Sequence, residues 1–189
     1  MSRTAVVLLN LGGPDSLEAV EPFLYNLFAD PAIFRIPLGF LFQKPLARFI
    51  SRKRGPEARH NYAAIGGKSP LLENTEAQAR ALAAALGEGY EVHVAMRYWH
   101  PRADAVVATL KQRGIEDVVL LPLYPQFSYT TTQSSIDDFR AACAAAGYAP
   151  RVRAIERWHD QPDYLDAVTD TLRAGLARFS QPDPAQLTV

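Results

Sequence analysis

Three clusters of aromatic, charged and hydroxyl side chains each follow a short apolar run. They are Leu11-Gly12-Gly13-Pro14, Arg97 to Pro101, and Tyr124 to Tyr129 with Thr130 to Thr132 after it. If each run is a strand of one parallel sheet, all three clusters meet at one edge. Aromatic faces, a guanidinium and hydroxyls at a helix N-terminus would suit a large flat aromatic ligand with anionic groups at its rim.

Taken singly, each cluster is weaker evidence for a ligand site. Gly12-Gly13-Pro14 is more often a tight turn than a ligand loop, and it lacks the third glycine of a dinucleotide fingerprint, so NAD binding is not expected. Arg97 could pair with a structural carboxylate as readily as with a substrate, and its aromatic neighbours favour the substrate. The hydroxyls of Thr130 to Ser135 exceed what one helix N-cap requires.

A basic run leads into a second glycine loop. Arg52-Lys53-Arg54 precedes Tyr62 to Leu71, which contains Gly66-Gly67-Lys68-Ser69. A phosphate loop would need glycine where Tyr62 stands and a buried strand before it, so a nucleoside triphosphatase is excluded. The basic run alone is more simply a solvated helix end.

Metal ligands are not grouped in the sequence. His60, His93, His100 and His159 show no pairing at ligand spacing, and Cys143 is the only cysteine. We therefore expect no metal site and no disulfide within this chain, and a single cysteine fits the cytoplasm. Lysine plus arginine balance aspartate plus glutamate at 20 each, which argues against nucleic acid as a partner.

The segment Ile33 to Phe42 is apolar on all sides. Its proline and glycine predict a loop that displays Phe34, Ile36, Leu38, Phe40, Leu41 and Phe42. These side chains could pack against the sheet, which is slightly favoured, or form an exposed lip for a hydrophobic ligand or membrane surface. Charges at Arg35, Lys44 and Arg48, with breaks at proline and glycine, exclude a membrane span.

The order of elements predicts an α/β fold with a mostly parallel sheet flanked by helices. Strands are expected at 6–11, 90–96, 117–124 and 152–155, with a fifth opening at 187–189. Helices are expected after the first strand, with a capping box at Asp15 and Glu18, and at 103–113, 131–146 and 162–179. Gly114 and Gly147 should end two of them.

Four motifs together resemble ferrochelatase: LNLGGP at 9–14, YAAIGGKSPL at 62–71, MRYWHP at 96–101 and LPLYPQFS at 121–128. The likeness is closest to the protoporphyrin type. It implies two similar three-layer, flavodoxin-like halves with a porphyrin held between them. The chain 1–189 would then be the N-terminal porphyrin-binding domain, incomplete at its C-terminal end, with the second α/β half absent.

The resemblance also implies a set of porphyrin contacts. They fall on Leu11, Arg54, Tyr62, Ser69, Arg97, Tyr98, Tyr124 and Ser135. Arg54 and Arg97 would orient propionates, and Tyr62 and Tyr98 would contact the ring. Leu11 stands where other members have tyrosine or methionine, so packing on the macrocycle is expected there rather than a polar or metal-approach role.

The family's catalytic histidine lies in an S-A-H motif on the strand that would begin where this chain stops, and its acidic partner lies further on. No catalytic or metal-binding residue is therefore expected in this chain. The substrates would be Fe²⁺ and a porphyrin, with no tightly bound cofactor. The location would be cytoplasmic, with possible peripheral membrane contact through Ile33 to Phe42.

Two other functions stay open. One is a chelatase for another tetrapyrrole, such as sirohydrochlorin with cobalt or nickel, against which the MRYWHP and LPLYPQ strings argue. The other is a module that binds a porphyrin without inserting metal.

Overall fold

The computed structural model describes residues 3–34 and 38–179. The chain divides into two compact units, Met1–Glu156 and Arg157–Val189. The expected strand opening at 187–189 and the side chain of Ile36 lie outside the described residues.

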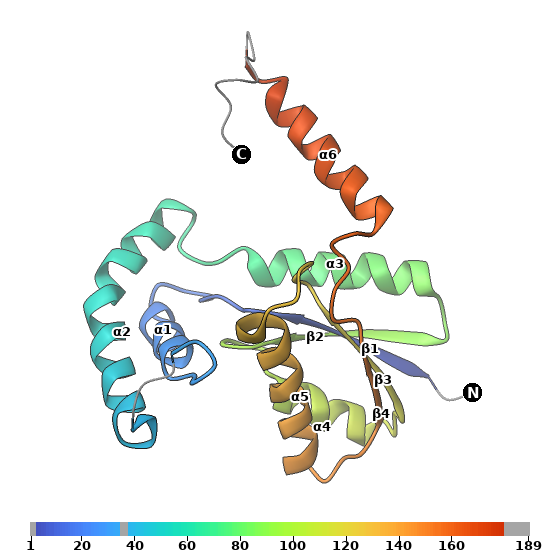
Figure 1. Cartoon of the computed structure of the whole chain (residues 1–189), viewed down its shortest axis with the longest axis horizontal. Coiled ribbons are helices and arrows are strands. Elements are labelled where there is room, and N and C mark those ends of the chain that lie inside the picture. Colours follow the sequence, from blue (N-terminus) through green and yellow to red (C-terminus); the bar gives the residue numbers. More distant parts are fainter. Residues whose placement is uncertain (1–2, 35–37, 180–189) are drawn as a thin grey trace. The chain divides into compact units, whose positions relative to one another are not determined.

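Four parallel strands form the sheet of the first unit, as predicted (Figure 1). They are β1 (Thr4–Asn10), β2 (Tyr90–Met96), β3 (Asp117–Pro122) and β4 (Arg151–Ala154), in the order β2-β1-β3-β4. In the register, Val7 lies opposite both His93 and Leu120. Because β1 is paired on both sides, its run of apolar residues from Ala5 to Leu9 is fully buried.

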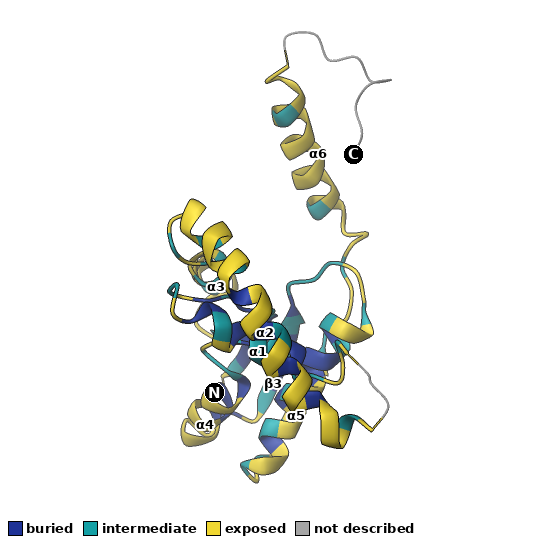
Figure 2. Ribbon diagram, turned by 90° about the vertical axis from the view of Figure 1, so that its left-hand side faces the viewer, coloured by how far each residue is buried: buried dark blue, intermediate teal, exposed yellow. Residues whose placement is uncertain are grey.

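Helices cover the two faces of this sheet and make three layers. On one face, α4 (Ala103–Gln112) and α5 (Ser134–Ala145) bury Val107, Leu110, Ile136 and Phe139 against the strands. On the other face, α3 (Leu71–Leu86) packs Ala79 near Val6 and Leu8. The two inner strands, β1 and β3, are the most deeply buried strands of the sheet, and the outer helix surfaces are exposed (Figure 2).

Right-handed crossovers explain which face each helix takes. The chain steps across the sheet in one direction from β2 to β3 and from β3 to β4, so α4 and α5 share a face. The step from β1 to β2 runs the other way, which places α3 on the opposite face. Because all four strands are parallel, their carboxyl ends lie at one edge of the sheet, where ligand sites of such sheets lie.

The first helix, α1 (Val20–Phe28), begins later than the sequence predicted. The prediction of a capping box at Asp15 and Glu18 is wrong, because the N-cap of α1 is Ala19. The Ser16 hydroxyl accepts a hydrogen bond from the N–H of Ala19 at 3.2 Å and supplies the local turn instead.

The second helix, α2 (Gly39–Ala64), corrects the expectation of a loop up to Phe42. It continues past Pro45 and Pro56, although an internal proline costs a helix about 3 kcal/mol. A stripe of small or polar residues, Gln43, Ala47, Ser51 and Gly55, is buried along it. Extensive contact of α2 with α1 offsets the cost of the prolines, and the amide of Gln43 donates to the Phe28 carbonyl at 3.0 Å.

The helix expected at 131–146 has two parts. A π-helical turn, η1 (Tyr129–Gln133), is capped by the Ser128 hydroxyl, which accepts from the N–H of Thr130 at 3.2 Å, and α5 follows from Ser134. Gly114 and Gly147 follow α4 and α5 with φ of 66° and 57°, as their helix-ending role predicted.

The second unit contains α6 (Pro162–Leu176), which ends three residues before its predicted limit. Its apolar stripe of Leu165, Val168, Leu172 and Leu176 is exposed. The Trp158 and Tyr164 rings meet edge to face 4.9 Å apart beside its first turn. Among the described residues, no helix is long and apolar enough to cross a membrane.

Candidate functional site

Backbone hydrogen bonds hold the three strand-end clusters together. The N–H groups of Arg97 and Tyr98 donate to the carbonyls of Asn10 and Leu11 at 2.8 and 2.9 Å. On the other side of β1, the N–H of Leu123 donates to the Leu9 carbonyl at 2.8 Å. The predicted convergence of the clusters at one sheet edge is confirmed.

The glycine pair after β1 allows its neighbours to approach closely. Gly12 has φ of 87°, and a β-carbon there would lie 3.0 Å from the Trp99 nitrogen. A β-carbon on Gly13 would overlap the side chain of Ser69, whose N–H donates to the Pro14 carbonyl at 2.8 Å. The loop that carries Ser69 is thereby joined to the strand-end clusters.

Asn10 is a structural residue of this edge that the sequence did not single out. Its side-chain oxygen accepts from the N–H of Leu11 at 2.8 Å, and its amide donates to the Thr75 hydroxyl at 3.1 Å. That hydroxyl donates to the Leu71 carbonyl inside α3 at 2.7 Å. The side chain of Asn10 thus fixes the chain as it leaves β1.

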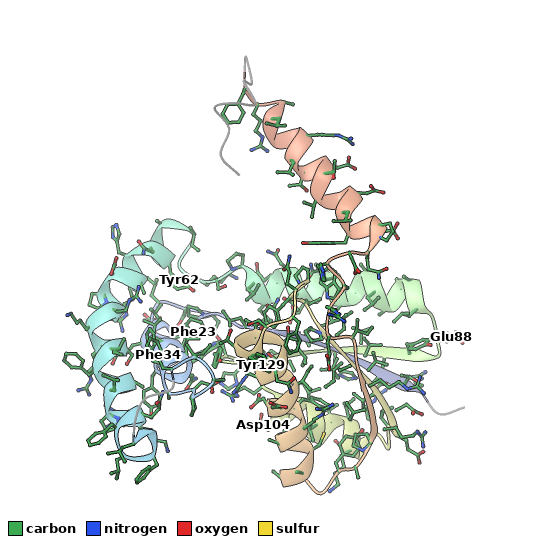
Figure 3. All side chains as sticks on the ribbon, in the orientation of Figure 1. Phe23, Phe34, Tyr62, Glu88, Asp104 and Tyr129 are labelled. Atoms are coloured by element: carbon green, nitrogen blue, oxygen red, sulfur yellow. The ribbon has the colours of Figure 1, made fainter. Side chains whose placement is uncertain are left out.

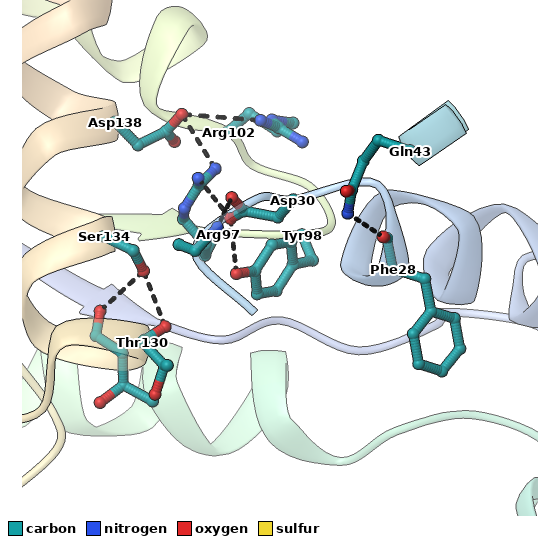
Figure 4. Close-up of polar contacts among 11 residues, drawn as sticks. Phe28, Asp30, Gln43, Arg97, Tyr98, Arg102, Thr130, Ser134 and Asp138 are labelled. Atoms are coloured by element: carbon teal, nitrogen blue, oxygen red, sulfur yellow. Dashed lines mark hydrogen bonds and ion pairs between the residues drawn. The ribbon is translucent and has the colours of Figure 1, made fainter. Parts of the chain in front are cut away.

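Arg97 lies between two carboxylates (Figure 4). Its guanidinium contacts Asp30 Oδ2 at 2.6 Å and Asp138 Oδ1 at 3.1 Å, and Arg102 lies 3.8 Å from the same Asp138 atom. Pairing with structural carboxylates is the alternative that the sequence left open for Arg97. Neither Asp30 nor Asp138 was predicted, because no spacing pattern connects isolated acidic residues on distant segments to Arg97.

Tyr98 is buried, with 1% of its surface exposed, and its hydroxyl donates to Asp30 Oδ2 at 2.7 Å. Burial, reinforced by the Asp30 carboxylate, raises the pKa of the Tyr98 phenol far above its usual value. Burial also raises the pKa of Asp138, while Arg97 and Arg102 oppose that rise. In this structure Tyr98 is part of the protein interior beneath the edge.

Buried polar atoms without a hydrogen-bond partner gather at this edge. In the described ranges they are Arg97 Nε, Trp99 Nε1, the Tyr124 hydroxyl and the Ser135 hydroxyl. Burial raises the pKa of Tyr124 to about 12, and the rise is opposed by the Ser135 hydroxyl, which lies beside the Tyr124 hydroxyl outside normal hydrogen-bond geometry, and by the charge of Arg97. Each unmet buried group costs about 1–3 kcal/mol, and such costs are typical of functional sites.

A cavity of about 480 Å³ opens beside the clusters. One wall is Pro31, Ala32 and Ile33, and the other comes from Tyr129, Gln133, Ser134 and Asp137. Tyr129 is 78% exposed and meets Phe127 edge to face at 5.2 Å, so aromatic surface is available to a ligand there.

Two expected contacts lie apart from this group, on α2. Arg54 is exposed and makes no ion pair within residues 3–34 and 38–179. Tyr62 lies at the end of α2 (Figure 3), and partial burial raises the pKa of its phenol. The structure therefore brings together Leu11, Ser69, Arg97, Tyr98, Tyr124 and Ser135, and joins neither Arg54 nor Tyr62 to them by a hydrogen bond or ion pair.

Five apolar side chains that the structure describes before and within the first turn of α2 are exposed. Phe34, Leu38, Phe40, Leu41 and Phe42 are all exposed, with Phe40 at 85%. For these five side chains the expectation of packing against the sheet is wrong. The buried stripe of α2 faces α1, and the large apolar side chains at the start of α2 face outward.

No group of three or more histidine, cysteine, aspartate or glutamate residues is placed to hold a metal ion in the described part of the chain. Fold and edge together define an α/β protein whose candidate site lies beyond the carboxyl ends of its parallel strands, where ligand sites of such sheets occur.

The particular family follows from comparison with known proteins. The ferrochelatase family model matches residues 3–189. The chain is 48% identical over 178 residues to the ferrochelatase of Geotalea daltonii, covering 94% of this chain and 56% of that protein. It is 49% identical over 191 residues to that of Gloeobacter violaceus, covering 97% and 57%. The chain belongs to the ferrochelatase family and spans about half the length of these curated relatives.

Proposed function

We propose that this chain is the porphyrin-binding half of a ferrochelatase, and that the complete gene product inserts Fe²⁺ into a porphyrin. The observation that carries the proposal is the joining of three strand-end motifs and the Ser69 loop at one sheet edge. Aromatic rings, hydroxyls and a hollow of about 480 Å³ at this edge suit the rim of a flat macrocycle.

The cations for the porphyrin carboxylates come from α2 in this proposal. Arg97 is offset by Asp30 and Asp138, whereas Arg54 is exposed without an ion-pair partner among the described residues. Arg54 would hold a propionate by a charge-assisted hydrogen bond. Leu11 would pack on the ring, Ser69 would border it from the loop after α2, and Tyr62 would border it from the end of α2.

Insertion of iron into a porphyrin requires a base and a bent macrocycle. Each iron that enters replaces two pyrrole protons, with no change of oxidation state, so the protein has to accept protons as the metal binds. We assign that base to a histidine beyond this chain and give this half the task of binding and orienting the porphyrin.

An absorbance titration with protoporphyrin, together with an iron-insertion assay on the complete gene product, tests the proposal. Saturable binding with insertion supports a ferrochelatase. Binding without insertion supports the porphyrin-binding module instead. A complete gene product that shows neither contradicts both functions.

The exposed apolar residues on α2 support a second part of the proposal, contact with a membrane surface. Phe40, Leu41 and Phe42 are exposed, and Phe49 on the same helix is 65% exposed. Such side chains enter the boundary between headgroups and acyl chains. Flotation with phospholipid vesicles should fall on replacing Phe40 and Leu41 by serine. Replacing the exposed Leu86 of α3 by serine is the control and should leave flotation unchanged.

A further inference from the structure

Asp30 closes the turn by which the chain leaves α1. Its carbonyl accepts from the N–H groups of Ile33 and Phe34, both at 3.1 Å. Its Oδ1 accepts from the N–H of Ala32 at 2.9 Å. One residue therefore fixes the backbone of the segment 31–33, which forms one wall of the 480 Å³ cavity.

The other carboxylate oxygen of Asp30 points into the protein. Oδ2 accepts from the Arg97 guanidinium at 2.6 Å and from the Tyr98 hydroxyl at 2.7 Å, and the Asp30 side chain is only 9% exposed. The Asn26 amide adds a bond to the Tyr98 carbonyl at 3.1 Å. Charge-assisted hydrogen bonds with so little access to solvent are strong and directional, so they join the turn after α1 to the end of β2.

Arg97 extends this tie to the opposite wall. Its second partner, Asp138, lies on α5, directly after the Tyr129 to Asp137 segment that forms that wall. Two carboxylates and the guanidiniums of Arg97 and Arg102 balance in charge, so the cluster has no positive excess to attract a substrate anion. The cluster instead holds the two walls of the cavity at a fixed separation, because Arg97 contacts Asp30 next to one wall and Asp138 next to the other.

We propose that Asp30 is a positioning residue for porphyrin binding. Through Arg97 and Tyr98 it sets the separation between the 31–33 wall and the η1–α5 wall, and the rim of the macrocycle enters between them. Asp30 itself touches no substrate. The inference rests on the proposed function and adds the residue that shapes this part of the site.

The test replaces Asp30 by asparagine in the complete gene product. The porphyrin KM should rise about tenfold while kcat changes by less than about twofold, because binding of the ground state and of the transition state is weakened equally and proton transfer is not affected. Tyr98→Phe removes one of the two bonds to Oδ2 and should raise KM by roughly a third to a half as much on a logarithmic scale. Asp30→Glu retains the carboxylate and should recover part of the affinity.

Glu91→Gln is the matched control. Glu91 accepts from Arg113 at 2.7 Å, its side chain is 12% exposed, and it lies near the start of β2, away from the site. This variant should lose stability yet retain the porphyrin KM. A wild-type KM in folded Asp30→Asn would overturn the inference, and so would an equal rise in Glu91→Gln. If Asp30→Asn does not fold, the KM of Tyr98→Phe decides in the same way. Failure of the wild-type protein to bind porphyrin would instead contradict the proposed function.

Discussion

The side chain of Ser69 lies against the α-carbon of Gly13, so closely that no β-carbon fits at position 13. Gly13 and Ser69, which are 56 positions apart in the chain and belong to two different motifs, are in direct contact there. Gly13 lacks the positive φ of Gly12, so its need for glycine comes from this contact and not from backbone conformation.

Gly13→Ala should therefore destabilise the protein by about 1–3 kcal/mol, the usual effect of overpacking, and weaken porphyrin binding. Ser69→Gly in the same molecule should recover most of the loss by making room for the methyl group. Urea unfolding of both single variants and the double variant gives the coupling energy. Additive effects would show that the two residues do not compete for this space.

Much of the fold could be predicted from the sequence because its signals are local. Apolar runs such as Val118 to Leu121 indicate buried parallel strands, and the clusters after them had to meet at one edge. The course of α2 could not be predicted, since contact with α1 outweighs the breaking tendency of Pro45 and Pro56.

The site could be predicted only in part for the same reason. Motif residues such as Leu11, Ser69 and Tyr124 lie at the edge. Asp30 is 67 residues from Arg97, and its role depends on a tertiary contact that leaves no periodic signal in the sequence. An arginine beside aromatic residues indicated a substrate contact, and only the structure reveals the two carboxylates that surround it.

Arg97→Ala should be strongly destabilising. Removing the guanidinium leaves the nearly buried Asp30 and the partly exposed Asp138 without their main partner, and breaking a buried pair such as Arg97–Asp30 typically costs about 3–5 kcal/mol. Lysine at this position should recover little, because a single ammonium cannot replace the two-sided fork.

Arg151→Ala is the comparison for that variant. Its guanidinium lies 2.6 Å from Asp117, the same separation as in the Arg97–Asp30 pair, but the Arg151 side chain is 66% exposed. It should change chemical unfolding very little. Equal losses in the two variants would contradict the view that burial gives the Arg97 pair its importance.

The pH dependence of stability should have a contribution from Glu91. Burial disfavours its charge, but hydrogen bonds from His93 and Arg113 outweigh burial and hold the pKa of this carboxyl below its usual 4.5. With a lower pKa in the folded state, Glu91 adds stability above the unfolded value, and this is lost as pH falls through the folded value.

Unfolding free energy measured by urea between pH 7 and pH 3 should therefore fall less steeply below about pH 4.5 in Glu91→Gln than in the wild type. The variant should also be less stable at neutral pH, where the ionised pair is intact. An identical slope below pH 4.5 in both proteins would mean that the carboxyl has the same pKa folded and unfolded.

Ser135→Ala separates stability from binding at the sheet edge. The Ser135 hydroxyl is buried beside the Tyr124 hydroxyl but makes no hydrogen bond of normal geometry, so removing it relieves a desolvation cost and should leave the protein unchanged or stabilise it by up to about 1 kcal/mol. If the hydroxyl is kept for the ligand, porphyrin affinity should fall in the same variant. Thermal unfolding and porphyrin titration on one preparation measure both effects.

Ser51→Ala is the control. The Ser51 hydroxyl is also buried, but it donates to the Arg48 carbonyl at 3.1 Å, so this variant should lose stability and retain its affinity for porphyrin. A stabilised Ser135→Ala that binds porphyrin like the wild type would remove this hydroxyl from the site and leave its burial without a functional reason.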